Sequence, residues 1–145
     1  RKLAKDLGVG DRVHFLGRLP ALEDVYAKIG GSDALVHPAL HEAFGQACLE
    51  SLALGVPVIC LDWGGPGLIV DETSGYKVVP TDREETIARL SEAMRHLATE
   101  GRRLGAEACR SRAVGEFSWS GIAAEIDTHY RRLCAVPVES MAVVR

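Results

Sequence analysis

Two glutamates that could accept hydrogen bonds from a ligand stand eight residues apart, at Glu42 and Glu50, in the stretch HEAFGQACLE (residues 41–50). Between them lies a Phe-Gly step, and the apolar run that follows favours a helix. The first N–H groups of a helix lack backbone partners, and Gly45 has no Cβ to hold a phosphate away from them. Carboxylates instead accept hydrogen bonds from hydroxyl groups. The stretch therefore predicts a site for phosphate flanked by hydroxyl-rich groups, as in a nucleotide sugar.

Two continuous apolar runs bracket this stretch and predict the strands that position it. DALVHP (33–38) precedes it and GVPVICLDW (55–63) follows it, and neither alternates, which is typical of strands buried on both faces of a parallel sheet. We expect a helix between them from about Phe44 to Leu54, ended by Gly55. Glu42 then lies just outside the helix, and Glu50 lies within it, roughly two turns on. Ligands of parallel α/β sheets bind where the strands end and the helices begin.

The remaining pattern alternates between strands and helices. Strands are expected at RVHFLG (12–17) and SGYKVVP (74–80), and helices at 22–30, 81–100, about 102–114 and about 121–133. Thr81 and Glu84 have the spacing of a capping box at the start of the second of these helices. Such alternation predicts an α/β fold, a Rossmann-like parallel sheet with helices on both faces.

The composition disfavours some classes of binding partner and favours one cellular compartment. The 145 residues carry a net charge of −3 without a dense run of Lys or Arg, which disfavours nucleic acid and an anionic membrane surface as partners. No apolar stretch reaches the roughly 18 residues of a membrane span; whether a longer chain associates with membranes stays open. The four cysteines form no Cys-x-x-Cys pair, which favours reduced thiols and a cytoplasmic location.

The segment HEAFGQACLESLALGVPVICLDWGGPGLIV (41–70) resembles the Glu-x7-Glu segment of retaining GT-B glycosyltransferases of family 4, also called group 1. The resemblance extends from VHFLGRL to FSW, with the elements in the family's order. It implies the C-terminal, nucleotide-sugar-binding half of a two-domain, hexosyltransferase-like enzyme of carbohydrate biosynthesis. Residues 1–134 would form this domain, lacking its first strand and helix, and 135–145 would be a tail. The N-terminal GT-B acceptor domain of the longer chain would be its partner, and the fragment alone is expected to be inactive.

The resemblance also implies roles for individual residues. Glu42 would be catalytic and contact the donor sugar, and Glu50 would accept hydrogen bonds from the ribose hydroxyls. The sugar and diphosphate would meet Phe44, Gly45 and Gln46, and the base would lie near Gly17, Arg18 and Leu19. The donor substrate would be a nucleoside diphosphate sugar, with no further cofactor. No metal is predicted, because no carboxylate cluster has the spacing of a Mg²⁺ site.

Several alternatives stay open at this point. Gly64 and Gly65, in the WGGPG loop after the second apolar run, could line the ligand site or form a simple turn. His37 and His41 are four residues apart, but the first ends a strand and Pro38 intervenes, so a structural or loop role is favoured. The same architecture also serves sugar-nucleotide epimerases and phosphorylases. In a non-catalytic α/β interaction module, Asp62 would be the phosphoacceptor, although it lacks an acidic pair.

Overall fold

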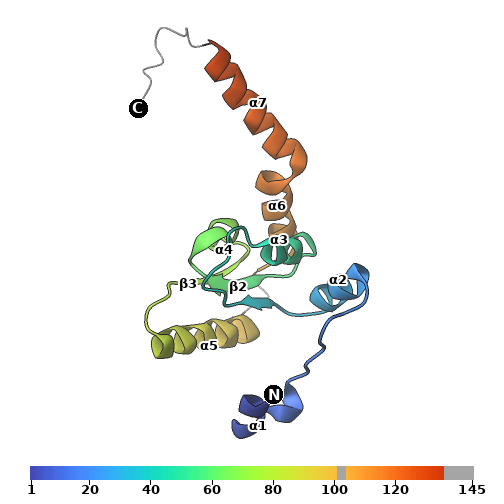
Figure 1. Cartoon of the computed structure of the whole chain (residues 1–145), viewed down its shortest axis with the longest axis vertical. Helices are drawn as coiled ribbons and strands as arrows, with labels where there is room; N and C mark the ends of the chain where they lie inside the picture. The colour runs from blue at the N-terminus through green and yellow to red at the C-terminus, as the bar shows by residue number, and fades with distance from the viewer. Residues whose placement is uncertain (101–103, 136–145) are drawn as a thin grey trace.

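The computed structural model describes residues 1–100 and 104–135, with a three-stranded parallel sheet at its centre (Figure 1). The strands are β1 (Leu35–His37), β2 (Val58–Leu61) and β3 (Gly75–Val78), in the order β1-β2-β3. In the central register, Val36 pairs with Ile59 and Ile59 with Tyr76. All four residues of β2 are buried, as its continuous apolar run predicts. The predicted α/β class with a parallel sheet is confirmed.

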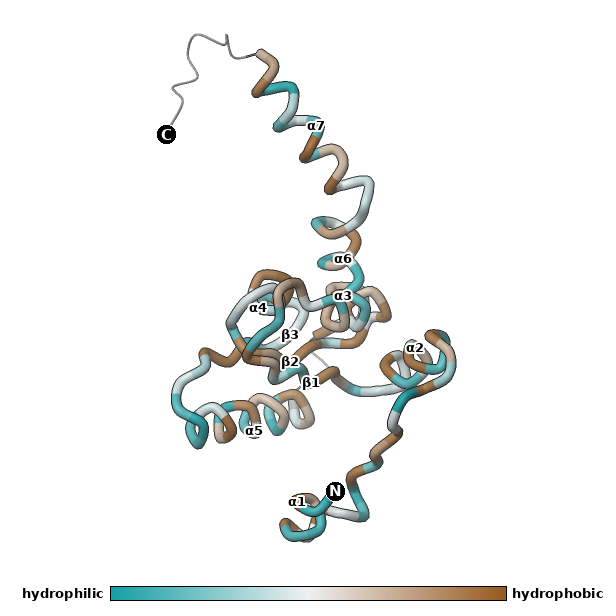
Figure 2. The backbone as a smooth tube through the Cα atoms, in the orientation of Figure 1, coloured by the Kyte–Doolittle hydropathy of each residue, from teal (hydrophilic) through white to brown (hydrophobic). Residues whose placement is uncertain are grey.

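Helices cover both faces of the sheet, also as predicted. Helices α3 (Gln46–Ala53) and α4 (Gly64–Ile69) lie over one face, and α5 (Arg83–Glu100) lies against the other (Figure 1). Helix α6 (Ala106–Phe117) packs on α3, which places Cys109 and Ala113 in the same core as Cys48 and Leu52. Figure 2 shows mostly hydrophobic residues at this centre, around β2 and α4. The core therefore holds the strand ends and the start of α3 in fixed positions.

The predicted strand at 12–17 is wrong. Short helices α1 (Lys2–Asp6) and η1 (Gly10–Arg12) precede this segment and α2 (Leu22–Gly30) follows it, but residues 13–19 form neither strand nor helix. Phe15 and Leu16 are about half exposed, at 49% and 54%. A β-favouring sequence becomes a strand through pairing with a neighbour, and no neighbouring strand lies beside it within the described residues.

The capping prediction for α5 is wrong by one residue. Asp82, not Thr81, is the capping residue: its Oδ1 accepts hydrogen bonds from the N–H groups of Glu84 and Glu85, both at 2.9 Å. An ionised carboxylate is a stronger acceptor than a hydroxyl, which favours the start at Asp82. Helix α6 begins at Ala106, later than the predicted 102, and residues 101–103 lie outside the described part of the chain.

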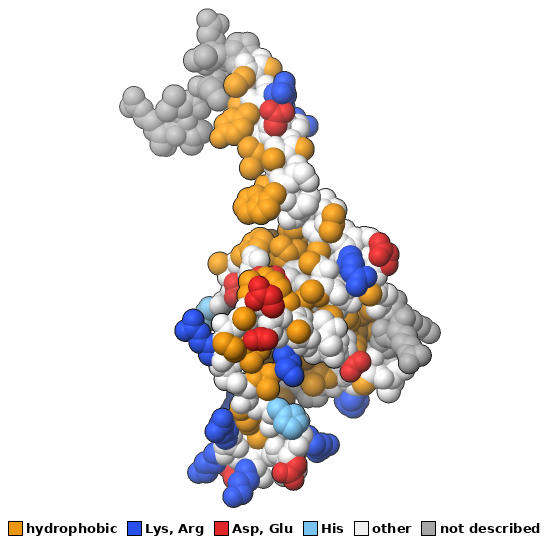
Figure 3. All heavy atoms as spheres, turned by 90° about the vertical axis from the view of Figure 1, so that its right-hand side faces the viewer, with side chains coloured by type: hydrophobic (Ala, Val, Ile, Leu, Met, Phe, Trp, Pro, Cys, Tyr) orange, Lys and Arg blue, Asp and Glu red, His pale blue; other side chains and the backbone are white. Residues whose placement is uncertain are grey.

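Helix α7 (Trp119–Ala135) extends away from the sheet (Figure 1) and is longer at both ends than the predicted 121–133. Trp119 is 86% exposed, and Figure 3 shows hydrophobic side chains along this helix. The predicted tail lies outside the described residues from 136 onward. Among the described helices, none has the length and apolar character needed to cross a bilayer.

Candidate functional site

The loop between β1 and α3 carries the first glutamate and ends at Gly45, the residue that caps α3. Gly45 has φ +93°, a left-handed conformation that residues with a Cβ rarely adopt. The Cβ position at Gly45 faces the ring of Pro66, 3.0 Å from its Cγ, so this glycine allows α4 to pack closely. Beyond it, the N–H groups of Gln46 and Ala47 make no hydrogen bond within the described residues. These two donors remain available at the start of the helix.

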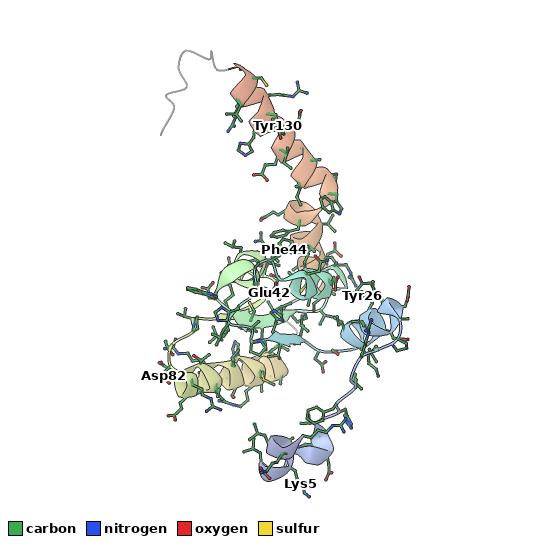
Figure 4. All side chains as sticks on the ribbon, viewed as in Figure 1. Lys5, Tyr26, Glu42, Phe44, Asp82 and Tyr130 are labelled. Carbon is green, nitrogen blue, oxygen red and sulfur yellow. The ribbon has the colours of Figure 1, made fainter. Side chains whose placement is uncertain are left out.

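The carboxylate of Glu42 is turned back toward its own loop. Its Oε1 accepts hydrogen bonds from the N–H groups of Phe44, at 3.2 Å, and Gly45, at 3.0 Å. Oε2 lies 3.9 Å from Nε2 of His37, at the end of β1. Figure 4 shows Glu42 and Phe44 above the centre of the sheet. The acid thus occupies two of the N–H groups that the sequence offers for an anion.

The WGGPG stretch is the start of a helix, so the alternative of a simple turn is wrong. Gly64 and Gly65 are the first two residues of α4, and the N–H of Gly65 donates to the carbonyl oxygen of Glu42 at 3.2 Å. A Cβ at Gly64 or Gly65 would overlap the carbonyl oxygens of Glu42 and Phe44, respectively. The glycines therefore permit the site loop to lie directly on α4.

Glu50 has two side-chain partners. Its Oε1 accepts hydrogen bonds from Nε2 of Gln46, at 3.1 Å, and from the hydroxyl of Tyr26 on α2, at 3.5 Å. Partial burial and the nearby Glu50 carboxylate raise the pKa of Tyr26 above its usual value of 10.0. The sequence analysis did not single out Tyr26 as a partner of Glu50. A tyrosine within a predicted helix is a detectable signal, since a half-buried hydroxyl is usually hydrogen-bonded.

The predicted residues Gly17, Arg18 and Leu19 lie on the segment before α2. Gly17 has φ +70°, and both it and Arg18 are exposed. Within the described residues, no hydrogen bond or ion pair joins this segment to Glu42 or Glu50. Phe44, by contrast, lies within the site loop with 47% of its surface exposed. The structure thus brings 42–50 and 64–65 together.

Other reactive side chains near the strand ends are already occupied or neutral. Asp62 pairs with Lys77 at 3.3 Å, and Lys77 also donates to the carbonyl of Gly67. Burial, with a smaller effect of Glu42, raises the pKa of Cys48 to about 11, and burial raises that of Cys60 to about 12. Both thiols therefore stay protonated at neutral pH. No cluster suited to a metal ion occurs in the part of the chain that the structure describes.

Two surface hollows lie elsewhere. One, of about 440 Å³, lies between β3 and α5, and the other, of about 1120 Å³, extends from the edge of β1 to α5. Neither is lined by Glu42 or Glu50. The candidate site is therefore an open surface at the carboxyl end of β1, and it can contact one side of a ligand.

Comparisons with known proteins show which family the sequence matches. A sequence model of the family described as glycosyl transferases group 1 matches residues 1–108. The GDP-mannose-dependent alpha-mannosyltransferase of Mycolicibacterium smegmatis is 38% identical over 118 residues, which cover 80% of this chain and 30% of that protein. The D-inositol 3-phosphate glycosyltransferase of Mycobacteroides abscessus is 34% identical over 135 residues, covering 92% of this chain and 29% of that protein.

Among solved structures, the sucrose-phosphate synthase of Thermosynechococcus elongatus is similar, with a TM-score of 0.74 and 29% identity. The match covers 92% of this chain and 33% of the synthase. The chain thus spans about a third of the length of these three proteins.

Proposed function

Because the chain belongs to the glycosyl transferases of group 1, we propose that it is the donor-binding domain of a retaining glycosyltransferase. The substrate of the reaction is a nucleoside diphosphate sugar, from which the sugar passes to an acceptor. The observation that carries the proposal is the start of α3, where Glu42 and Glu50 lie on either side of unpaired helix N–H groups. Family membership sets aside the non-catalytic interaction module.

In this proposal, the diphosphate binds at the N–H groups of Gln46 and Ala47, beside Phe44 and Gly45. Fixed N–H dipoles stabilise the negative charge that grows on the leaving diphosphate without having to reorganise. Binding of the diphosphate also competes with Glu42 for the N–H groups of Phe44 and Gly45. The freed carboxylate then turns toward the donor sugar, where it acts as the catalytic residue. No metal or further cofactor takes part in this scheme.

Glu50 takes the nucleoside side of the donor. Its Oε1 is held by Gln46 and Tyr26, and no hydrogen bond to its Oε2 occurs within the described residues. That oxygen can accept hydrogen bonds from the two ribose hydroxyls. Gly17, Arg18 and Leu19, together with Gly64, would complete the donor site once the rest of the longer chain is present.

The longer chain supplies the second half of the site. We propose that residues 1–134 are the donor domain, that 135–145 are a C-terminal tail, and that an N-terminal acceptor domain faces α3 across a cleft. Support comes from the share of about a third that the chain covers in its relatives. The free cysteines, three of them buried, are consistent with a reducing, cytoplasmic location.

Calorimetry on the chain tests this assignment, with UDP, GDP and ADP as probes and EDTA present. GDP is included because one relative is named for GDP-mannose. We expect weak binding of at least one diphosphate, and no heat with any of them at concentrations up to about 1 mM would contradict the site.

Substitution of each glutamate separates the two roles. Glu50→Ala should weaken binding of the diphosphate by about 10- to 100-fold, because a charged acceptor is lost. Glu42→Ala should not weaken it, because the diphosphate lacks a sugar and the loop gains two free N–H groups. Equal losses in the two variants would refute this division of roles.

A further inference from the structure

His37 is the last residue of β1, and its side chain lies beneath the site loop. Its Nε2 atom is buried and has no hydrogen-bond partner within the described residues. Oε2 of Glu42 lies 3.9 Å from this atom. The side chains of His37 and Glu42 are 21% and 35% exposed, respectively. A buried polar atom without a partner is unusual, because leaving it unpaired destabilises the fold.

The surroundings of Nε2 restrict what can satisfy it. The atom is shielded from bulk solvent, and no described protein group lies within hydrogen-bonding distance of it. An N–H···O bond needs about 2.7–3.2 Å between the two atoms, so a closure of roughly 1 Å brings Glu42 within range. Oε1 of Glu42 is already held by the N–H groups of Phe44 and Gly45, which leaves Oε2 as the acceptor.

We propose that His37 is a positioning residue for Glu42. In its neutral form with the proton on Nε2, the imidazole donates to Oε2 and holds the carboxylate at the end of the sheet. The anchor is rigid, because His37 lies in register with Cys60 on the buried strand β2, whereas the loop 38–45 has no regular structure. This inference rests on the proposed function, in which Glu42 leaves the N–H groups of its loop and faces the donor sugar. His37 then keeps the carboxylate near the site while Oε1 turns outward.

The contact is tested by NMR of the histidine ring nitrogens in the chain. Glu42→Gln should shift the ring signals of His37, identified by their loss in His37→Gln, and leave His14, His96 and His129 unchanged. The matched control is Glu125→Gln, which removes the acid 3.8 Å from His129 on α7 and should shift His129 alone. If the His37 signals are the same with and without the Glu42 charge, the proposal is overturned.

The consequence for transfer is tested in the longer parent chain with GDP-mannose as donor. His37→Leu should lower kcat by about 10- to 100-fold, the effect of losing one hydrogen bond to a charged group. KM for the donor should change by no more than about twofold, because the contact orients the carboxylate without binding substrate. His37→Gln should restore most of kcat, since its amide N–H can replace Nε2–H.

The outcomes distinguish this inference from the function on which it rests. Unchanged kcat in His37→Leu, or equal loss in His37→Gln, would overturn the positioning role, since a donor at this position would then be irrelevant. If the parent transfers no sugar from any nucleotide sugar, the proposed function fails, and the NMR comparison alone then decides whether His37 holds Glu42.

Discussion

At the scale of single residues, the two glutamates differ in what restrains them. Glu42 is held by N–H groups of its own loop, which a bound diphosphate can displace. Glu50 is held by side chains, one from its own helix and Tyr26 from another helix. Spacing in the sequence predicts that both acids lie near the start of α3. It does not reveal their partners, because Tyr26 is 24 residues from Glu50 and meets it only through packing of α2 on α3.

The contact between Tyr26 and Glu50 predicts a shift that absorbance can measure. Glu50→Gln should lower the pKa of Tyr26 toward its usual value of 10.0, because the negative charge that opposes phenolate formation is removed. Ultraviolet titration of tyrosinate, with the curve of a Tyr26→Phe variant subtracted, isolates this residue. An unchanged Tyr26 curve would show that the two groups do not interact.

At the scale of elements, a helix or strand can be predicted when its own residues carry the signal. It cannot be predicted when it depends on contacts with distant residues. Strands β1 and β2 follow from continuous apolar runs, β3 follows from a β-favouring run, and helix α3 follows from an apolar run that ends at Gly55. Helix α4 does not, since Gly-Gly-Pro-Gly is typical of a turn and becomes helical only against the loop at Glu42 and Phe44. For the segment 12–17, the sequence predicts a strand that does not form. Its β-favouring residues have no strand to pair with in the described part of the chain.

The packing of the site loop on α4 predicts opposite effects for two glycine substitutions. Gly65→Ala should destabilise the chain by more than about 2 kcal/mol, since the added Cβ would overlap the backbone of Phe44. Gly115→Ala, within α6 where nothing lies near the added methyl group, should stabilise it by about 0.5–1 kcal/mol. Urea denaturation of both variants measures the difference. Equal stability of the two would mean that α4 and the site loop do not touch.

At the scale of the whole molecule, one network joins segments on the face of the sheet that carries the site. Arg112 of α6 donates to the carbonyls of Leu68 and Ile69 at the end of α4, both at 2.9 Å, and pairs with Asp71 at 3.3 Å. Burial raises the pKa of Asp71, but hydrogen bonds from Ser74 and Thr73 and the charge of Arg112 outweigh it and lower the pKa overall. The carboxylate of Asp71 thus holds Arg112 against the end of α4, the helix on which the site loop lies.

This network predicts a pH-dependent contribution to stability. The folded-state pKa of Asp71 lies below its ordinary value of 3.8, so its contribution is present above that value and is lost as pH falls through the folded pKa. Asp71→Asn should cost about 1–3 kcal/mol at neutral pH and progressively less in acid. Glu72→Gln, at the neighbouring exposed acid, is the control and should change little. A penalty for Asp71→Asn that is the same in strong acid would contradict the assignment.

The central claim is that Glu42 serves an active site that this domain shares with the rest of a longer chain. It is tested most directly by turnover of a radiolabelled nucleotide sugar by the parent chain, by its Glu42→Gln variant and by the chain alone. Holding donor and acceptor together can lower a barrier by roughly 7–11 kcal/mol, and a single domain positions only one of them. We expect transfer by the parent, a large loss in Glu42→Gln with the melting temperature nearly unchanged, and none by the chain alone. Full activity in Glu42→Gln, or transfer by the chain alone, would contradict the claim.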